Sequence, residues 1–149
     1  MPLFARRSLF PAAASVVLTG AAPVGYYADQ KVVYHNDGRP PDSAAYFGML
    51  LANLRNHIEA VGMDHIVLRV LSNGQGVELF VAATQDKAIA RAIDALRVDG
   101  VVFLVCNNTL NAMHLDWHAL YGVQEGDVVP SGVAELGRLQ GMGFAYIHP

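Results

Sequence analysis

The chain has 149 residues, which suits one domain of common size and leaves too little for two. Hydrophobic residues make up 53% and charged residues 15%, so a large core is possible and an intrinsically disordered chain is excluded. The ten basic and thirteen acidic residues are scattered, which excludes a nucleic-acid-binding surface, and the single cysteine excludes an internal disulfide or a multi-cysteine zinc site.

Residues 1–28 are predicted to be an export signal of the twin-arginine type followed by a short linker. Arg6 and Arg7 precede Ser8-Leu9-Phe10, and residues 11–22 are small and apolar, with cleavage after either Ala21 or Ala22. A transmembrane anchor and a retained hydrophobic arm are the alternatives, and the anchor is disfavoured by the breakers Pro11, Gly20 and Pro23. We therefore expect an exported, periplasmic protein with no stable membrane span after processing.

The remainder, residues 29–149, is predicted to form one α/β domain. Apolar residues recur at helical spacing in some segments, whereas others are short runs rich in β-branched residues. The type of residues 77–83 is ambiguous, and the third helix is expected to break near His114. Strands are predicted at 30–35, 65–71, 101–105, 128–129 and 144–148, and helices at 42–61, 86–98, 108–121 and 131–139.

This alternation of strands and helices predicts a doubly wound fold with a mainly parallel, five-stranded sheet and helices on both faces. Right-handed crossovers leave few topologies, and the commonest has the strand order 2-1-3-4-5. In that order the first and third strands are neighbours, so their carboxyl ends would border one crevice. His35 and Asn36 would then lie beside Cys106, with Ser131 on the other side of the thiol.

Cys106 is the candidate nucleophile. It follows the unbroken apolar run at 101–105 and precedes Asn107 and Asn108, either of which could cap the next helix. A thiol at the carboxyl end of a strand and the amino end of a helix has a lowered pKa and is open to reagents. The alternative is a small, inert, buried side chain, which is the common state of a free cysteine.

Two further sequence patterns are weaker evidence for a binding site than Cys106 is. The loop 72–76 contains Gly74 and could expose backbone N–H groups, but it lacks the lysine and spacing of a P-loop. His114 and His118 have the i, i+4 spacing of a helical ligand pair, and a third ligand would have to come from Asp116, Cys106 or a neighbouring chain. We predict no metal and no cofactor, because flavin binding would be argued from topology alone.

Several segments resemble the DsrE/DsrF-like proteins, which are small sulfur-relay and YchN-like domains, and in particular an exported branch of them. The resemblance runs from about residue 30 to the end of the chain. It is most distinctive at the thiol and at the start of the last helix. The matching segments are Val33-Tyr34-His35-Asn36, Asn53-Leu54-Arg55-Asn56-His57, Val105-Cys106-Asn107-Asn108-Thr109-Leu110, Val129-Pro130-Ser131-Gly132-Val133-Ala134-Glu135-Leu136 and Gly143-Phe144-Ala145-Tyr146-Ile147.

The resemblance implies a homotrimer or homohexamer and a cysteine, here Cys106, that carries sulfane sulfur as a persulfide. A protein or a small sulfur compound would be the donor or acceptor. His35 is then the candidate proton partner of this sulfurtransferase-like carrier, and the residues proposed to bind the sulfur-bearing group are Asn36, Gly74, Asn107, Asn108 and Ser131. The competing hypothesis is a non-enzymatic oligomeric binding domain, in which Met113, Trp117 and Tyr121 line a subunit contact.

Overall fold

The computed structural model describes residues 25–149, so nearly all of the predicted export segment lies outside the described residues. Within that range no helix combines the length and the apolar character needed to cross a membrane. The strands are β1 (Gln30–Asn36), β2 (Ile66–Ser72), β3 (Val102–Cys106), β4 (Val128–Val129) and β5 (Ala145–Ile147). The helices are α1 (Ser43–Val61), α2 (Glu78–Ala83), α3 (Lys87–Val98), α4 (Asn107–Met113) and α5 (Gly132–Gly141).

The five strands form one all-parallel sheet, which confirms the predicted fold class. The predicted strand order was wrong in detail, because the observed order is β4-β3-β2-β1-β5. β1, β2, β3 and β4 follow one another across the sheet, and the chain then returns to place β5 on the other side of β1. As a result β2 separates β1 from β3, and the strand order reverses between β1 and β5.

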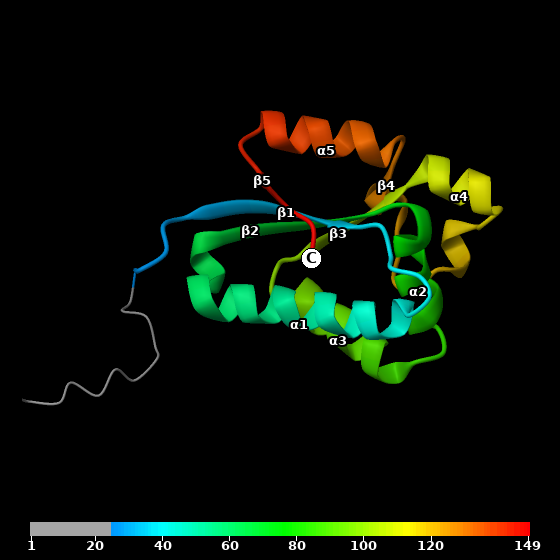
Figure 1. The fold of residues 1–149 in the computed structure, drawn as a ribbon, viewed down its shortest axis with the longest axis horizontal. Helices are drawn as coiled ribbons and strands as arrows, with labels where there is room; N and C mark the ends of the chain where they lie inside the picture. Colours follow the sequence, from blue (N-terminus) through cyan, green and yellow to red (C-terminus); the bar gives the residue numbers. More distant parts are fainter. Residues whose placement is uncertain (1–24) are drawn as a thin grey trace, which may run out of the picture.

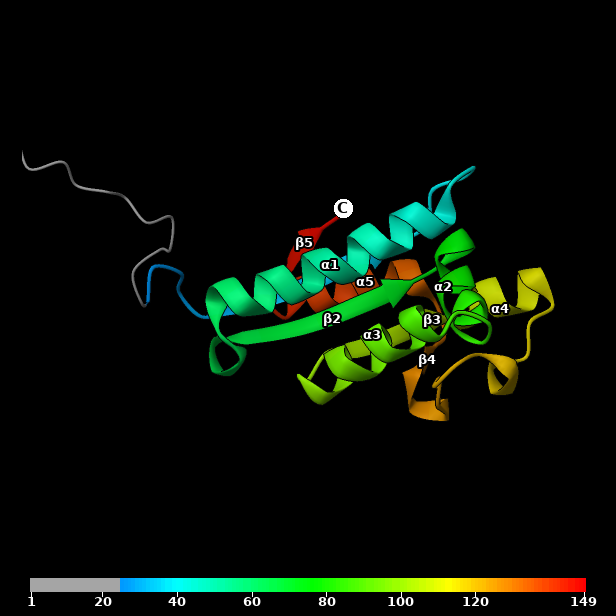
Figure 2. The ribbon, with the colours of Figure 1, turned by 90° about the horizontal axis from the view of Figure 1, so that it is seen from below.

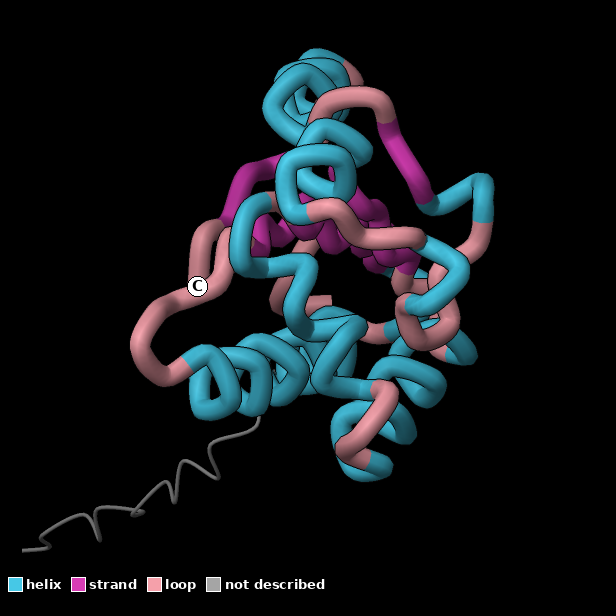
Figure 3. Tube along the Cα trace, turned by 90° about the vertical axis from the view of Figure 1, so that its right-hand side faces the viewer, coloured by secondary structure: helices cyan, strands magenta, loops and turns pink. Residues whose placement is uncertain are grey.

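This reversal decides which face each helix covers. Right-handed crossovers in one direction place their helices on one face, and the single return crossover places its helix on the other. Accordingly α1 and α3 lie together on one face of the sheet, and α5 is the only helix of residues 25–149 on the opposite face (Figures 1 and 2). Figure 3 looks onto the carboxyl ends of the strands and shows the sheet between the two helical layers.

Two hydrophobic cores result from the alternation of side chains along the strands. The larger core packs α1, α2 and α3 against one face and contains Phe47, Phe80 and Phe103. The smaller core lies under α5, and it is made of Val33, Leu71, Leu104, Leu136, Leu139 and Phe144. Side chains two apart in a strand share a face. His35, Asn73 and Cys106 follow Val33, Leu71 and Leu104 by two residues and therefore also face α5.

The helices begin where the sequence supplies caps. Asp42 accepts a hydrogen bond from the Ala45 N–H at 3.0 Å, and Asp86 accepts one from the Ala88 N–H at 2.7 Å. The ambiguous segment 77–83 becomes α2 after a short 3-10 turn at Gly74–Val77. The expected break near His114 is confirmed, because α4 ends at Met113 and His114 adopts a left-handed conformation with φ of 54°.

Candidate functional site

Cys106 ends β3 and lies on the sheet face that α5 covers. Its Sγ accepts a hydrogen bond of 3.1 Å from the backbone N–H of Gly132, the first residue of α5. An ideal Cβ built on Gly132 would lie 3.1 Å from Cβ of Cys106 and 3.2 Å from Cβ of Asn73. A glycine at this position therefore lets the end of the helix approach the sulfur closely.

The expectation that Asn107 or Asn108 caps the following helix was wrong, because Cys106 itself occupies the N-cap position of α4. The strand passes into the helix without an intervening residue. An N-cap side chain faces the amides of the second and third helical residues, which here are Asn108 and Thr109. Neither amide has the distance and angle of a hydrogen bond to the sulfur, but both lower the pKa of the thiol.

The pKa of the Cys106 thiol is the outcome of opposing effects. Burial raises it, and the N–H of Gly132, the hydroxyl and N–H of Thr109 and the N–H of Asn108 together lower it further than burial raises it. The net pKa lies below the ordinary value of a cysteine thiol. Thr109 is itself held in place, because its Oγ1 accepts a 2.9 Å hydrogen bond from the N–H of Gly74.

Cys106 is only 5% exposed, whereas the sequence predicted an open thiol. The difference arises because the amino end of α5 packs directly over the end of β3. Gly132 closes the space above the sulfur, together with Asn73 and Leu71, whose side chains lie within 3.3 Å of the Cβ position on Gly132. The site thus combines a thiol of lowered pKa with restricted access.

His35 does not touch Cys106, because β2 lies between their strands. Asn73, which follows β2, bridges them. Its Oδ1 accepts a 2.9 Å hydrogen bond from Nε2 of His35, while its Cβ lies close to Gly132. The Nδ1 of His35 is 2.8 Å from the hydroxyl of Tyr146, so that hydroxyl donates to it in the neutral ring.

A family model described as DsrE/DsrF-like matches residues 30–149. The chain belongs to the DsrE/DsrF-like family. A solved structure of MTH1491, a protein of unknown function from Methanobacterium thermoautotrophicum, is 33% identical and superposes with a TM-score of 0.67. The similarity covers 81% of this chain and all of that one. Comparison with curated proteins gives no match.

In this DsrE-like chain, Asn36 is fully buried. Its Nδ2 donates to Oγ of Ser72 at 3.0 Å and to the carbonyl of Gly76 at 2.8 Å, and its Oδ1 accepts from the N–H of Gly38. Every hydrogen-bonding atom of this amide is therefore engaged inside the protein. Asn36 joins the ends of β1 and β2 to the turn at 74–77, which holds Gly74 beside Thr109.

The other predicted binding residues lie around the same edge of the sheet. Ser131 caps α5, and its Oγ accepts a 3.4 Å hydrogen bond from the N–H of Ala134. Asn107 is half-buried and Asn108 is exposed in the first turn of α4. Asn107 and Asn108 directly follow Cys106 in the chain, Ser131 precedes Gly132, and Asn108 is the exposed one of the three.

His114 and His118 do not share a helical face, because α4 ends between them. His118 donates instead to the carboxylate of Asp116, with Nδ1 2.6 Å from Oδ1. An i, i+4 pair shares a face only in an unbroken helix, and a break near His114 was itself expected from the sequence. His57, on α1, is half-buried and hydrogen-bonded to the hydroxyl of Tyr34 and to Oε1 of Gln30.

Sequence reasoning missed three residues that shape this site. Asn73, Thr109 and Gly132 were recognised only as parts of a loop, a motif and a helix start. Their positions could have identified them, because each follows the carboxyl end of a strand by no more than three residues. The strand order concealed their roles, because only the observed order places β2 between β1 and β3.

Proposed function

We propose that this protein handles sulfur, with Cys106 as a carrier that accepts and passes on sulfane sulfur as a persulfide. Membership of the DsrE/DsrF-like family supports a sulfur-relay role in general terms. The observation that carries the assignment to this residue is the hydrogen bond from the Gly132 N–H to Sγ of Cys106, at 3.1 Å. A donor aimed at the sulfur stabilises the thiolate, which is the nucleophilic form.

The proposed reaction is an exchange at sulfur and needs no external oxidant. The Cys106 thiolate attacks the outer sulfur of a donor R–S–SH, a new S–S bond forms to Cys106, and the donor's S–S bond breaks. The electron pair of the broken bond leaves with the donor as RS⁻. An acceptor thiolate then attacks the outer sulfur of the Cys106 persulfide, which regenerates the Cys106 thiolate.

The surrounding residues have distinct roles in this proposal. The Gly132 N–H and the Thr109 hydroxyl stabilise the negative charge on the inner sulfur before attack and after release. Asn108, which is exposed in the first turn of α4, and Ser131, which precedes Gly132, are the candidates to contact the outer sulfur. His35 acts through Asn73, whose position it fixes, rather than by taking a proton from the thiol directly.

Intact-mass spectrometry after incubation with polysulfide or thiosulfate tests the proposal. The parent protein is expected to gain one sulfur that a reductant removes, and Cys106→Ser to gain none while keeping its circular dichroism spectrum. Loading of Cys106→Ser to the same extent would overturn the proposal. So would a parent protein that stays unloaded although alkylation shows its thiol to be reactive at neutral pH.

The second candidate is a non-enzymatic binding domain. The 5% exposure of Cys106 favours it, as does an apolar pocket of about 410 Å³ bordered by α1, α2 and the end of α4. Phe47, Val81, Met113 and Leu115 line this pocket. A thiol that alkylates slowly at neutral pH and never loads sulfur would favour this candidate over the carrier.

We also propose that the protein is exported and forms a homotrimer or homohexamer. The export proposal is supported by the sequence pattern Arg6-Arg7 followed by a small, apolar stretch. The oligomer is supported by exposed apolar side chains, among them Val98 at 86% and Val133 at 70%. Signal processing in cells and light scattering of the purified protein test the two proposals separately.

A further inference from the structure

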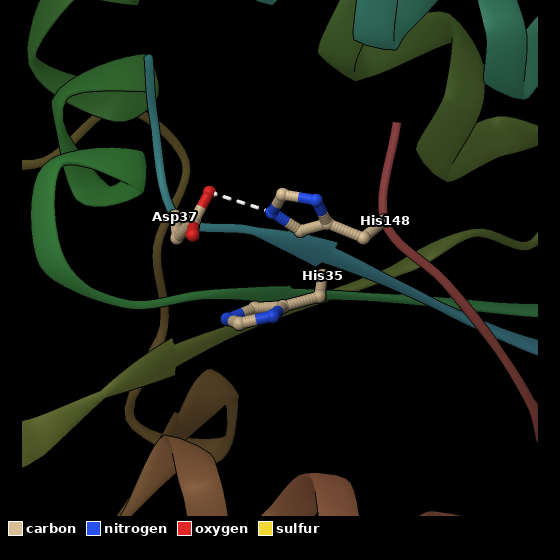
Figure 4. Close-up of side chains that lie close together, drawn as sticks. All are labelled: His35, Asp37 and His148. Carbon is tan, nitrogen blue, oxygen red and sulfur yellow. Dashed lines mark hydrogen bonds and ion pairs between the residues drawn. The ribbon is translucent and has the colours of Figure 1, made fainter. Parts of the chain in front are cut away.

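Three potential metal ligands gather where β1 and β5 end. His35 and Asp37 come from the end of β1, and His148 directly follows β5 (Figure 4). One ligand atom from each side chain lies within 4.8 Å of the other two. Nε2 of His148 is 2.9 Å from Oδ1 of Asp37, and the two imidazole rings are 5.4 Å apart between centroids.

The hydrogen bond to Asn73 decides which ring nitrogen of His35 is able to bind an ion. Its Nε2–H donates to Oδ1 of Asn73, an arrangement that fixes the tautomer and leaves the lone pair on Nδ1. Metal-binding histidines characteristically donate their second ring N–H to an oxygen acceptor in this way. The hydroxyl of Tyr146 lies 2.8 Å from Nδ1 and is the group that an ion would displace or recruit.

The position in the fold also suits a ligand. In open α/β sheets, ligands bind outside the carboxyl ends of the strands where the strand order reverses. That reversal lies between β1 and β5 here, and these are the strands that supply the cluster. The side chains of Asp37 and His148 are 42% and 39% exposed, so an ion can reach them from solvent.

We propose that His35, Asp37 and His148 bind a divalent transition-metal ion, with Zn²⁺ the best match to two imidazoles and one carboxylate. Tetrahedral coordination at about 2.0–2.2 Å requires ligand atoms roughly 3.4 Å apart. Rotation of the two exposed side chains would have to open the Asp37–His148 distance of 2.9 Å and close the other ligand distances, which are at most 4.8 Å, to reach that value. Three protein ligands leave a fourth position for water or for another molecule.

Two other histidine–aspartate pairs provide matched controls. His65 and Asp29 are 2.8 Å apart, and His118 and Asp116 are 2.6 Å apart. Both pairs are exposed, and neither belongs to a three-ligand group among residues 25–149. If any histidine–aspartate pair were enough, these pairs would bind Zn²⁺ as well as the cluster does.

Isothermal titration of the full, untagged chain with Zn²⁺ tests the site. We expect one ion per chain, with affinity reduced at least about tenfold in His148→Ala and in Asp37→Asn but unchanged in His118→Ala. Asp37→Asn keeps the side-chain shape, and circular dichroism checks the folding of each variant. Equal binding by all four proteins, or no binding by the parent, would overturn the proposal.

Substitution with Co²⁺ distinguishes this site from the thiol site. The bound ion is expected to show d–d absorption without a thiolate-to-metal charge-transfer band, and Cys106→Ser is expected to bind it equally well. A charge-transfer band that disappears in Cys106→Ser would overturn the assignment. Because the inference does not depend on the proposed sulfur chemistry, loss of sulfur loading in Cys106→Ser with intact metal binding separates the two.

Discussion

The backbone N–H of Gly132 donates a 3.1 Å hydrogen bond to Sγ of Cys106, although the two residues are 26 positions apart in the chain. The contact joins the end of β3 to the start of α5. It therefore depends on tertiary structure, whereas the amides of Asn108 and Thr109 are local to the cysteine. The relative weight of these donors can be measured by removing them one at a time.

Replacing Gly132 by proline removes the donor, and the ring carbon that takes the place of the amide hydrogen also moves the start of α5 away from the sulfur. Ser131 is extended, with φ of −144° and ψ of 120°, so it can precede proline. Gly132→Ala adds a Cβ but keeps the N–H, and it is the matched control. The pKa of the Cys106 thiol, taken from the pH dependence of its alkylation rate, is expected to be about one unit higher in Gly132→Pro than in Gly132→Ala, because a hydrogen bond to a charged group is worth about 1.5–3 kcal/mol. An equal pKa in the two variants would show that the donor does not stabilise the thiolate.

Thr109→Val removes the hydroxyl that helps lower the pKa of Cys106 and that accepts from the Gly74 N–H. The size of the side chain is kept. We expect the alkylation rate at neutral pH to fall about threefold, in line with the loss of about one neutral hydrogen bond. Thr109→Ser keeps the hydroxyl and should retain the parent rate. A fall of the same size in Thr109→Ser would point to packing and not to the hydroxyl.

Gly76→Ala should destabilise the fold strongly. A Cβ on Gly76 would lie 1.9 Å from the backbone oxygen of Asn36, a contact that only movement of the backbone can relieve. We expect a loss of about 3 kcal/mol or more in urea unfolding. Gly137→Ala, on the exposed side of α5 with nothing within 4 Å, is the control and should be neutral or stabilising by up to about 1 kcal/mol.

The pH dependence of stability should include a contribution from His57. Burial lowers the pKa of this histidine below its usual 6.5, so the unfolded chain binds a proton more readily than the folded one. Its contribution is therefore fully present above the unfolded pKa and is lost as the pH falls through that value towards the lower folded pKa. Urea midpoints measured at about pH 7.5 and pH 5.5 should differ less in His57→Gln than in the parent. An equal pH dependence in His57→Gln and in the parent would contradict this prediction.

The secondary structure was predictable because each element carries a local signal. The spacing of Tyr46, Leu50 and Leu54 identifies α1, and the run at 101–105 identifies β3. The placement of Cys106 at the end of a central strand followed from the same run. These properties depend on residues close together in the chain, and no tertiary contact overrides them.

The strand order and the details of the site were not predictable in this way. Strands buried on both faces have the same apolar pattern whatever their neighbours are, so the sequence did not show that β2 separates β1 from β3. The bridge through Asn73 follows from that order, whereas the cover over Cys106 depends on the pairing of β3 with β4, which the predicted order also contained. The grouping of Asp37 with His148, across 111 positions, also depends on which strand lies beside β1.

Among the helices of residues 25–149, α5 alone covers its face of the sheet, and its first residue, Gly132, also covers the thiol of Cys106. Because Cys106 is only 5% exposed, we expect reagents to reach its sulfur mainly in molecules whose α5 terminus has moved away. The rate of alkylation at Cys106 would then report how often the α5 terminus opens. Hydrogen exchange at the Gly132 amide is expected to depend on the same opening.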